Sequence, residues 1–286
     1  MCFAPGRPHC VRLACLLAVA LAACTAPKGQ TDIETGAVGC EAPDLQALDP
    51  LPPAYQSFSR TEAVAIALRE WRAFGQLVND EPPAMRPARA PDDKPERQAG
   101  LWERVGDYWR LGQNPDRPEA MWTGKHDEAG REFPASKEDR FAWSAAFVSY
   151  VMRSADAGAR FPYASSHHVY INIARQMSLG TTTGWAVMAE RVDAYAPKPG
   201  DLVCFSRTRR PLHFENLPTR HAYPAHCDVV IRNDPPTMTV VGGNVDDAVT
   251  EKHVPVTEDG KLSEAGAAPL DARYPWFVAL RVDYER

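Results

Sequence analysis

The chain has 286 residues, a formal net charge of −5 at pH 7 and 44% hydrophobic residues. This composition is that of a globular protein, and no apolar run in the sequence is long enough to form a permanent transmembrane helix. An acidic chain gains nothing by releasing the counterions of a nucleic acid, so the charge argues against general nucleic-acid binding.

The first 23 residues predict an export signal. Arg7 and Arg12 precede an apolar run over 13–23, and small residues end it. Cys24 follows Leu-Ala-Ala, which resembles the lipobox of bacterial lipoproteins. That resemblance implies cleavage before Cys24 and a lipid anchor on its sulfur, whereas an ordinary secretory signal with a chance cysteine is the alternative. Because Thr25 rather than aspartate follows, we expect the periplasmic face of the outer membrane.

Two segments separate this signal from the main domain. Residues 24–54 are rich in Pro, Ala, Gly, Thr and Asp without a sustained period, and they predict a tether. Residues 55–115 predict an N-terminal helical part, with helices over 57–78 and 97–111 where apolar residues recur at helical spacing. The tryptophans of the second helix could form an exposed binding stripe, but core packing is the preferred interpretation.

The main domain, residues 116–286, opens with a long irregular stretch that ends near residue 138. Long irregular stretches inside a domain are often functional, so Trp122 is a candidate substrate contact, with a lid over the core as the alternative. A helix is expected over 143–155, and because it is apolar almost all round it should be buried.

The pattern then changes to strands. Helices first and strands afterwards predict an α+β domain with an antiparallel sheet of about five strands. The expected strands are 200–205, 226–232, 237–241, 249–256 and 276–282.

A turn signal over 233–236 sets the register of one predicted hairpin. Antiparallel partners across it should place Ile231 opposite Thr239, and His226 opposite Asn244. An amide next to an imidazole can hold it in one tautomer and orientation, as the third member of a catalytic triad does. A slip of one residue would put His226 and Asn244 on opposite faces of the sheet.

Two cysteines occupy compatible positions on strands that we expect to be neighbours. Cys204 and Cys227 could therefore form a disulfide in an exported protein, which would leave Cys40 unpaired in the tether. Since Cys227 follows His226, its side chain points to the other face, which favours a structural role over a nucleophilic one.

The candidate nucleophile is Ser144, at the start of the buried helix. A helix N-terminus stabilises a developing anion, but a serine also needs a general base and an oxyanion hole. The alternative is that Ser144 is only the N-cap of the helix.

Four motifs occur in the order found in a known group of enzymes: WSAAFVSYV at 143–151, KPGDLVCF at 198–205, AHCDVVI at 225–231 and VVGGNV at 240–245. Together they resemble the core motifs of papain-like cell-wall hydrolases of the CHAP and NlpC type. A closer resemblance, over roughly 100–286, is to an uncharacterised family of bacterial lipoproteins and exported proteins, a domain of unknown function with serine in that helix.

The resemblance implies a role for each matching position. Ser144 takes the place of the nucleophile, His226 that of the base and Asn244 that of the orienting residue. Serine stands here where the enzymes have cysteine, so activity does not follow from the fold. Further residues that could line the cleft are Trp143, His167 and Tyr170, together with Trp122.

Two functions remain open from these motifs. The first is a cell-envelope hydrolase of amide bonds in peptidoglycan peptides. The second is a catalytically inactive papain-like module that binds cell-wall polymer or an envelope protein. The expected partners are an envelope polymer and, through Cys24, a membrane, but not a nucleic acid.

The remaining signals are weaker. Arg207, Arg209, Arg210 and Arg220 make a basic loop that could hold carboxylates, although a solvated loop is the ordinary interpretation. The sequence has no zinc-type Cys/His spacing, no HExxH, no GxGxxG and no Walker loop, so we expect neither a metal nor another cofactor.

Overall fold

A computed structural model describes residues 57–114 and 121–285, apart from the side chains of 138–140. The predicted export signal, Cys24, the tether and Cys40 lie outside the described residues. Within the described part of the chain, no helix is both long and apolar enough to cross a membrane.

The described residues contain helices followed by strands. The α-helices are α1 (Arg60–Ala73), α2 (Trp102–Gly112), α3 (Ser144–Ser154) and α4 (His167–Ser178). The strands are β1 (Val187–Glu190), β2 (Leu202–Ser206), β3 (Ala225–Asp234), β4 (Thr237–Val245), β5 (Ala248–Pro255) and β6 (Trp276–Val282).

All six strands form one antiparallel sheet in the order β1-β6-β2-β3-β4-β5. The expected α+β class and antiparallel sheet are therefore confirmed. The expected count of about five strands is corrected to six, because β1 is a four-residue edge strand that pairs with β6. So short a segment carries little period of its own, and the ladder to β6 is what makes it a strand.

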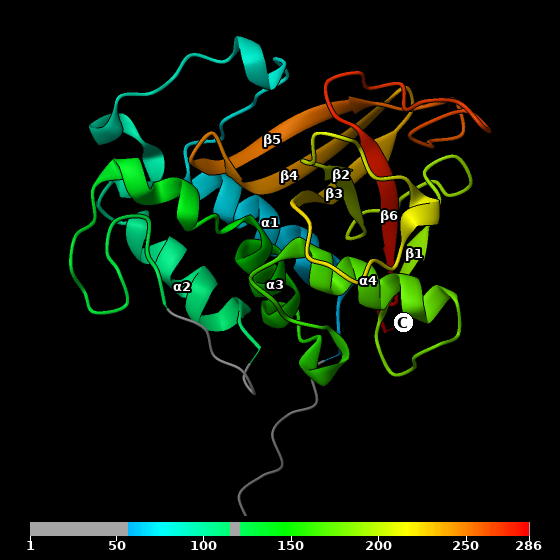
Figure 1. Cartoon of the computed structure of the whole chain (residues 1–286), viewed down its shortest axis with the longest axis horizontal. Helices are drawn as coiled ribbons and strands as arrows, with labels where there is room; N and C mark the ends of the chain where they lie inside the picture. The colour runs from blue at the N-terminus through cyan, green and yellow to red at the C-terminus, as the bar shows by residue number, and fades with distance from the viewer. Residues whose placement is uncertain (1–56, 115–120, 286) are drawn as a thin grey trace, which may run out of the picture. The chain divides into compact units, whose positions relative to one another are not determined.

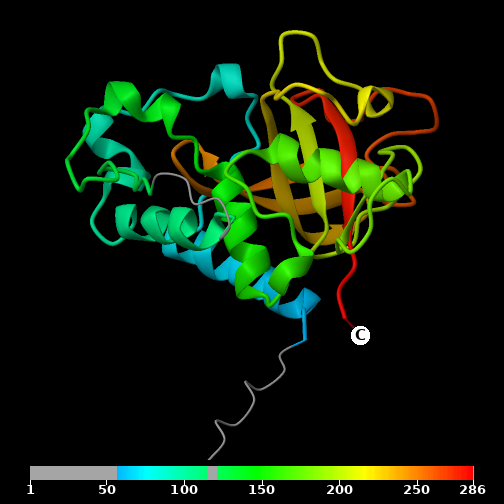
Figure 2. The same ribbon diagram turned by 60° about the horizontal axis from the view of Figure 1, so that its bottom comes forward.

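The helices gather against one face of the sheet, as Figures 1 and 2 show. Both α1 and α3 contact β3 and β4, while α4 contacts β1 and β3. The core on this side includes the first two helices, so the expected N-terminal helical part shares its core with the main domain. A smaller apolar cluster lies on the other face of the sheet, where Leu262 and Tyr274 of the segment before β6 cover residues of β2 to β5.

Helix α3 is the centre of the larger core, as its apolar sequence predicts. Its residues from Ser144 to Met152 are all buried. Two glycines let neighbouring backbones approach it closely. A Cβ at Gly112 of α2 would lie 2.2 Å from the carbonyl oxygen of Ala146, and one at Gly243 of β4 would lie 2.6 Å from Phe147. These contacts fix the start of α3 against β4.

The first helix ends earlier than the sequence predicts. Its apolar period continues to Val78, but α1 stops at Ala73 and is followed by positive φ angles at Gly75 and Gln76. Val78 instead forms a parallel bridge with Glu251 of β5. The left-handed backbone at Gly75 breaks the helix, and the backbone beyond it hydrogen bonds with β5 instead of continuing the helix.

The β3–β4 hairpin departs from the expected register near its turn. Val229 pairs with Val241, as predicted, but Thr239 pairs with Arg232 rather than with Ile231. A bulge at Ile231 absorbs one residue, so the predicted Ile231–Thr239 pair is wrong.

On the other side of β3, Cys204 of β2 lies directly opposite Cys227, and a disulfide joins them. This is the pairing that their strand positions suggested.

Candidate active site

Ser144 is the first residue of α3, and its hydroxyl faces a histidine. The N-cap of α3 is Trp143, so the interpretation of Ser144 as the N-cap is wrong. Instead, Ser144 Oγ lies 2.7 Å from His167 Nε2. The Ser144 and His167 side chains belong to residues that are each only 4% exposed. The start of α3 thus places a hydroxyl against an imidazole at a nearly dry site.

The other ring nitrogen of His167 hydrogen bonds with a tyrosine on the same helix. It begins α4, and its Nδ1 hydrogen bonds with the hydroxyl of Tyr170, one turn along, which is fully buried. Burial, followed by the electrostatic interaction with His226, lowers the pKa of His167 well below its ordinary value. His167 is therefore neutral at pH 7.

A second histidine, His226 of β3, has a carboxylate partner. His226 Nε2 lies 3.1 Å from Asp228 Oδ1. The two residues are two apart on one strand, so their side chains share a face. A Cβ at Gly242 of β4 would lie 1.9 Å from that Asp228 oxygen and 2.9 Å from His226 Nε2, so only glycine leaves room for this pair.

The other oxygen of Asp228 meets a buried lysine. Lys252 of β5 places its Nζ 2.6 Å from Asp228 Oδ2, and both side chains are 0% exposed. Aromatic rings surround the ammonium group at centroid distances of 5.2 Å for Phe205, 4.9 Å for Tyr274 and 5.9 Å for Trp276. The carboxylate and the cation–π contacts together compensate for removing this charge from water.

These contacts set the charge state of the His226 side of the site. Burial opposes ionisation of Asp228, but Lys252 and His226 outweigh it and hold the pKa of that carboxyl below its usual range. Burial lowers the pKa of His226, although Asp228 acts in the opposite direction. At pH 7 the site therefore contains an ionised Asp228 and a neutral His226.

The fold brings the two histidines together beside Ser144. The ring centroids of His167 and His226 are 5.3 Å apart. Of the two, His167 makes the hydrogen bond to Ser144, and within the described residues no such bond joins Ser144 to His226. The expected Ser144–His226 pair is thus near but not in direct contact.

Asn244 does not occupy the place expected for it. It has a positive φ of 55°, and the β4–β5 pairing shifts between Gly242 and Val245. The hydrogen-bonded partner of His226 is Asp228, and Asn244 lines the cavity beside them. The expected His226–Asn244 contact is corrected to His226–Asp228, because the chain leaves the extended conformation before Asn244.

The other predicted site residues are Trp143 and Trp122. Trp143 is 1% exposed and its indole N–H donates to Glu96, so it belongs to the core. Trp122 is partly buried and stacks on Phe141 with the ring centroids 3.6 Å apart. Trp122 therefore belongs to an aromatic cluster that precedes α3.

A cavity of about 450 Å³ opens beside His226. Ser144 and His167 do not line it. Its polar and charged lining residues are Arg86, Ser206, Arg207, His226, Asn244, Asp246, Lys252 and Arg273.

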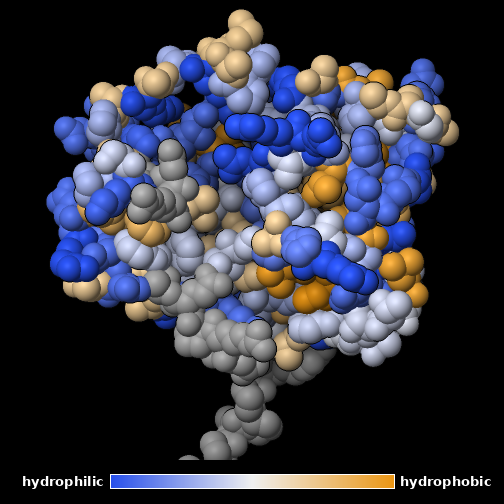
Figure 3. Space-filling view, viewed as in Figure 1, coloured by the Kyte–Doolittle hydropathy of each residue, from blue (hydrophilic) through white to orange (hydrophobic). Residues whose placement is uncertain are grey.

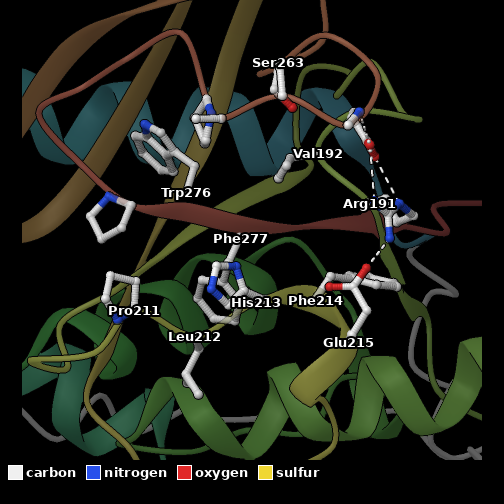
Figure 4. Close-up of a pocket in the computed structure, with 16 residues that line it drawn as sticks. Arg191, Val192, Pro211, Leu212, His213, Phe214, Glu215, Ser263, Trp276 and Phe277 are labelled. Atoms are coloured by element: carbon white, nitrogen blue, oxygen red, sulfur yellow. Dashed lines mark hydrogen bonds and ion pairs between the residues drawn. The ribbon is translucent and has the colours of Figure 1, made fainter.

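A second cavity, of about 410 Å³, lies beside β6 (Figure 4). Its lining includes three prolines, two phenylalanines and a tryptophan, and Arg191 bridges Asp193 and Glu215 at one end. The buried hydroxyl of Ser263 in its wall has no hydrogen-bond partner among the described residues. Neither Ser144 nor either histidine of the site lines this cavity, so it is separate from the candidate active site.

Asp228 and Lys252 are the site residues that sequence reasoning missed. The spacing His-x-Asp on a predicted strand was a signal for Asp228, since it puts both side chains on one face. Lys252 had no such signal, because a lysine in a polar strand is ordinarily exposed. In the described residues, no group of three or more His, Cys, Asp or Glu is placed to hold a metal ion.

Comparison with known proteins gives a family but no activity. A family model described as an uncharacterized protein conserved in bacteria (DUF2272) matches residues 96–282, which is more than half of the chain. No curated protein and no solved structure matches.

Proposed function

We propose that this chain, which belongs to the DUF2272 family of uncharacterised bacterial proteins, is a serine-dependent amide hydrolase of the cell envelope. The observation that supports the proposal is the meeting of the Ser144 hydroxyl with His167 at 2.7 Å, beside a second neutral histidine that is paired with a carboxylate. The resemblance of the four motifs to papain-like cell-wall hydrolases is part of this proposal, and it suggests peptidoglycan peptides as the substrate.

The hydrogen bonds of Tyr170 assign the proton on His167. The Tyr170 hydroxyl is fully buried and its hydrogen bond is to His167 Nδ1. A buried hydroxyl that fails to donate is costly, so the phenol donates to Nδ1. The proton of His167 is then on Nε2, which donates to Ser144 Oγ. His167 is therefore a positioning residue, and the serine proton is left for another acceptor.

The hydrogen bond of His226 assigns the opposite arrangement. An ionised carboxylate only accepts, so His226 Nε2–H donates to Asp228 and the lone pair is on Nδ1. The neutral ring with a free Nδ1 is the form that a general base needs. In this proposal His226 is the base and Asp228 takes the orienting role. The gap to Ser144 closes when substrate binds, because catalytic hydrogen bonds are often long without substrate.

The proposed reaction has two stages. Ser144 Oγ attacks the amide carbonyl carbon and its proton passes to His226 Nδ1. The C–N bond then breaks, and His226 gives the proton to the leaving amine. In the second stage water attacks the ester carbonyl carbon and gives a proton to His226. The C–Oγ bond then breaks, the carboxylic acid leaves, and His226 returns the proton to Ser144 Oγ. The first backbone N–H groups of an α-helix have no partner within the helix, and those at the start of α3 would donate to the oxyanion.

A binding module without catalysis is the second candidate. It is favoured by the 4% exposure of both Ser144 and His167 and by their absence from the wall of the 450 Å³ cavity. In that case the same hydrogen bonds would only stabilise the fold, and the cavity beside His226 would hold an envelope polymer.

Digestion of purified peptidoglycan sacculi separates the two candidates. Wild-type protein and the Ser144→Ala variant would be incubated with sacculi, and soluble products read by mass spectrometry. Ser178→Ala, which removes a hydroxyl at the far end of α4, is the matched control. New amine and carboxyl ends with wild type and with Ser178→Ala, but not with Ser144→Ala, would support the hydrolase. Sacculus binding without any product would support the binding module.

The cell-envelope location is proposed from the predicted export signal and Cys24. We expect Cys24→Ser to release the protein from the membrane fraction while leaving it exported, because the lipid anchor needs that sulfur. Fractionation followed by immunoblotting measures this. Unchanged membrane association of Cys24→Ser would count against the lipid anchor.

A further inference from the structure

We infer that the 450 Å³ cavity beside His226 binds a carboxylate of the substrate, with Arg207 as its principal ligand. This inference rests on the proposed function, because it assigns the substrate class of the same site: peptides with an acidic residue or a free carboxyl end next to the amide that is cleaved.

Cations dominate the wall of this cavity. Four positively charged side chains line it, and Asp246 is the single acid among the described lining residues. The charged groups of the wall are Arg86, Arg207, Lys252, Arg273 and Asp246.

The acids that pair with two of these cations lie behind them. Lys252 pairs with Asp228 at 2.6 Å and Arg273 pairs with Asp271 at 2.7 Å. The side chains of these acids are 0% and 2% exposed, and neither acid lines the cavity. Within the wall itself Arg86 pairs with Asp246 at 3.2 Å, so the four cations and one acid that line the cavity give its wall a net positive charge.

Arg207 is the cation that has a free guanidinium to offer. It follows β2 directly, and its backbone N–H donates to the Pro224 carbonyl just before β3. Its side chain is exposed, and no acid among the described residues pairs with it. Its charge contributes to lowering the pKa of both His167 and His226, which places the guanidinium within electrostatic reach of the two histidines.

The rest of the wall suits a short side chain that ends in a carboxylate. Phe205, Tyr274 and Pro275 provide apolar surface for an aliphatic stem, and Asn244 provides an amide. A guanidinium binds a carboxylate through two parallel hydrogen bonds, which fixes the orientation of the group as well as its position. A substrate held this way would present the neighbouring amide to His226.

Calorimetric titration of the full chain tests this inference without relying on turnover. The Ser144→Ala variant would be titrated with N-acetyl-Ala-Glu-Ala-amide and with the matching Gln peptide. We expect the Glu peptide to bind at least roughly tenfold more tightly, as a charge-assisted hydrogen bond predicts. An N-acetyl-Ala-Ala peptide with a free carboxyl end, compared with its amide, shows whether the carboxylate comes from a side chain or from a chain end.

Variants locate the site. Arg207→Gln should reduce binding of the preferred acidic peptide to the level of its neutral counterpart. Arg209→Gln, an exposed arginine of the same loop that does not line the cavity, should leave it unchanged. Equal binding of acidic and neutral peptides, no binding of any peptide, or no effect of Arg207→Gln would overturn the inference. Tighter binding of inorganic phosphate than of both acidic peptides would overturn it in favour of a phosphate site.

The two proposals fail in different ways. If wild-type protein cleaves nothing but Ser144→Ala still prefers the acidic peptide and Arg207→Gln removes that preference, the hydrolase is lost and the carboxylate site stands. If sacculi are cleaved but acidic and neutral peptides bind alike, only the carboxylate site is lost.

Discussion

His167 and His226 lie side by side, yet their surroundings assign them opposite parts. Their ring centroids are 5.3 Å apart, both residues are buried, and burial lowers the pKa of each. His167 faces the phenol of Tyr170, whereas His226 faces the carboxylate of Asp228. In the proposed assignment the phenol donates a hydrogen bond to the His167 ring, whereas the carboxylate accepts one from the His226 ring. In the proposed mechanism, the partner on the other ring nitrogen, rather than burial, decides which histidine accepts the proton of Ser144.

Replacing each histidine in turn should give the largest difference in kcat. We expect His226→Asn to lower kcat by roughly a thousandfold, or about 4 kcal/mol in the activation barrier, because the base is lost. Release of soluble peptides from sacculi measures the rate. Should His167→Asn cost as much and His226→Asn little, the assignment of the two roles would be reversed.

The carboxylate partner should also control stability. Asp228→Asn leaves Lys252 charged, buried and without its counterion, so we expect a loss of about 3–5 kcal/mol in the free energy of unfolding. The double variant Asp228→Asn with Lys252→Met removes the unpaired charge and should recover most of that stability. Urea unfolding measures both.

Measuring the activity of these variants distinguishes a catalytic role of the Asp228–Lys252 pair from a purely structural one. The double variant should fold and yet remain as inactive as the single variant, because His226 has lost its orienting carboxylate. A stable and fully active double variant would contradict the role of Asp228.

A smaller effect is expected at His167. His167→Gln replaces the rigid imidazole that positions Ser144 Oγ with a flexible amide but keeps the base, so kcat should fall about ten- to a hundredfold. His168→Gln is the matched control, since His168 is the next residue of α4 and bonds with Ser166 rather than with Ser144. A thousandfold loss for His167→Gln, with an intact fold by circular dichroism, would make His167 the base.

The pH dependence should be the smallest effect and should appear only on the acid side. Each histidine has a folded-state pKa below its ordinary value of 6.5, so the unfolded chain binds protons that the folded chain does not. The free energy of unfolding should therefore be independent of this pair above pH 6.5 and should fall as the pH drops below 6.5.

Thermal unfolding between pH 4.5 and 8 measures this dependence. The variant His167→Gln should reduce the slope below pH 6.5, because one of the two groups no longer titrates. A slope that is unchanged in this variant would show that other groups cause the acid destabilisation.

Much of the placement of residues on the helices and strands of this site follows from local sequence patterns. Alternation along β3 puts His226 and Asp228 on one face and Cys227 on the other, and the apolar run after Trp143 predicts a buried helix that starts at Ser144. The facing positions of Cys204 and Cys227 follow from two neighbouring strands. These features depend on residues a few positions apart, and the period of the helix or strand decides which face each of them occupies.

The features that were missed depend on distant parts of the chain. The Ser144–His167 contact joins two helices through an intervening irregular segment, and no local period predicts it. Asn244 lies where the β4–β5 register shifts, and the backbone has positive φ angles at Asn244, Asp246 and Asp247. The bulge at Ile231 and the burial of Lys252 likewise arise only when the sheet is assembled.

The face of the molecule viewed in Figure 3 is mostly hydrophilic, with small apolar patches that lie apart from one another. A carboxylate-bearing peptide, which is itself hydrophilic, would suit such a surface better than an apolar partner would.

Reaction of the protein with a fluorophosphonate probe, followed by peptide mass spectrometry, tests the activation of Ser144 most directly. We expect one adduct, on Ser144, that forms in wild type, forms more slowly in His167→Gln and is absent in His226→Asn. No adduct in wild type, an adduct on another serine, or an adduct on Ser144 that forms equally fast in His226→Asn would contradict it.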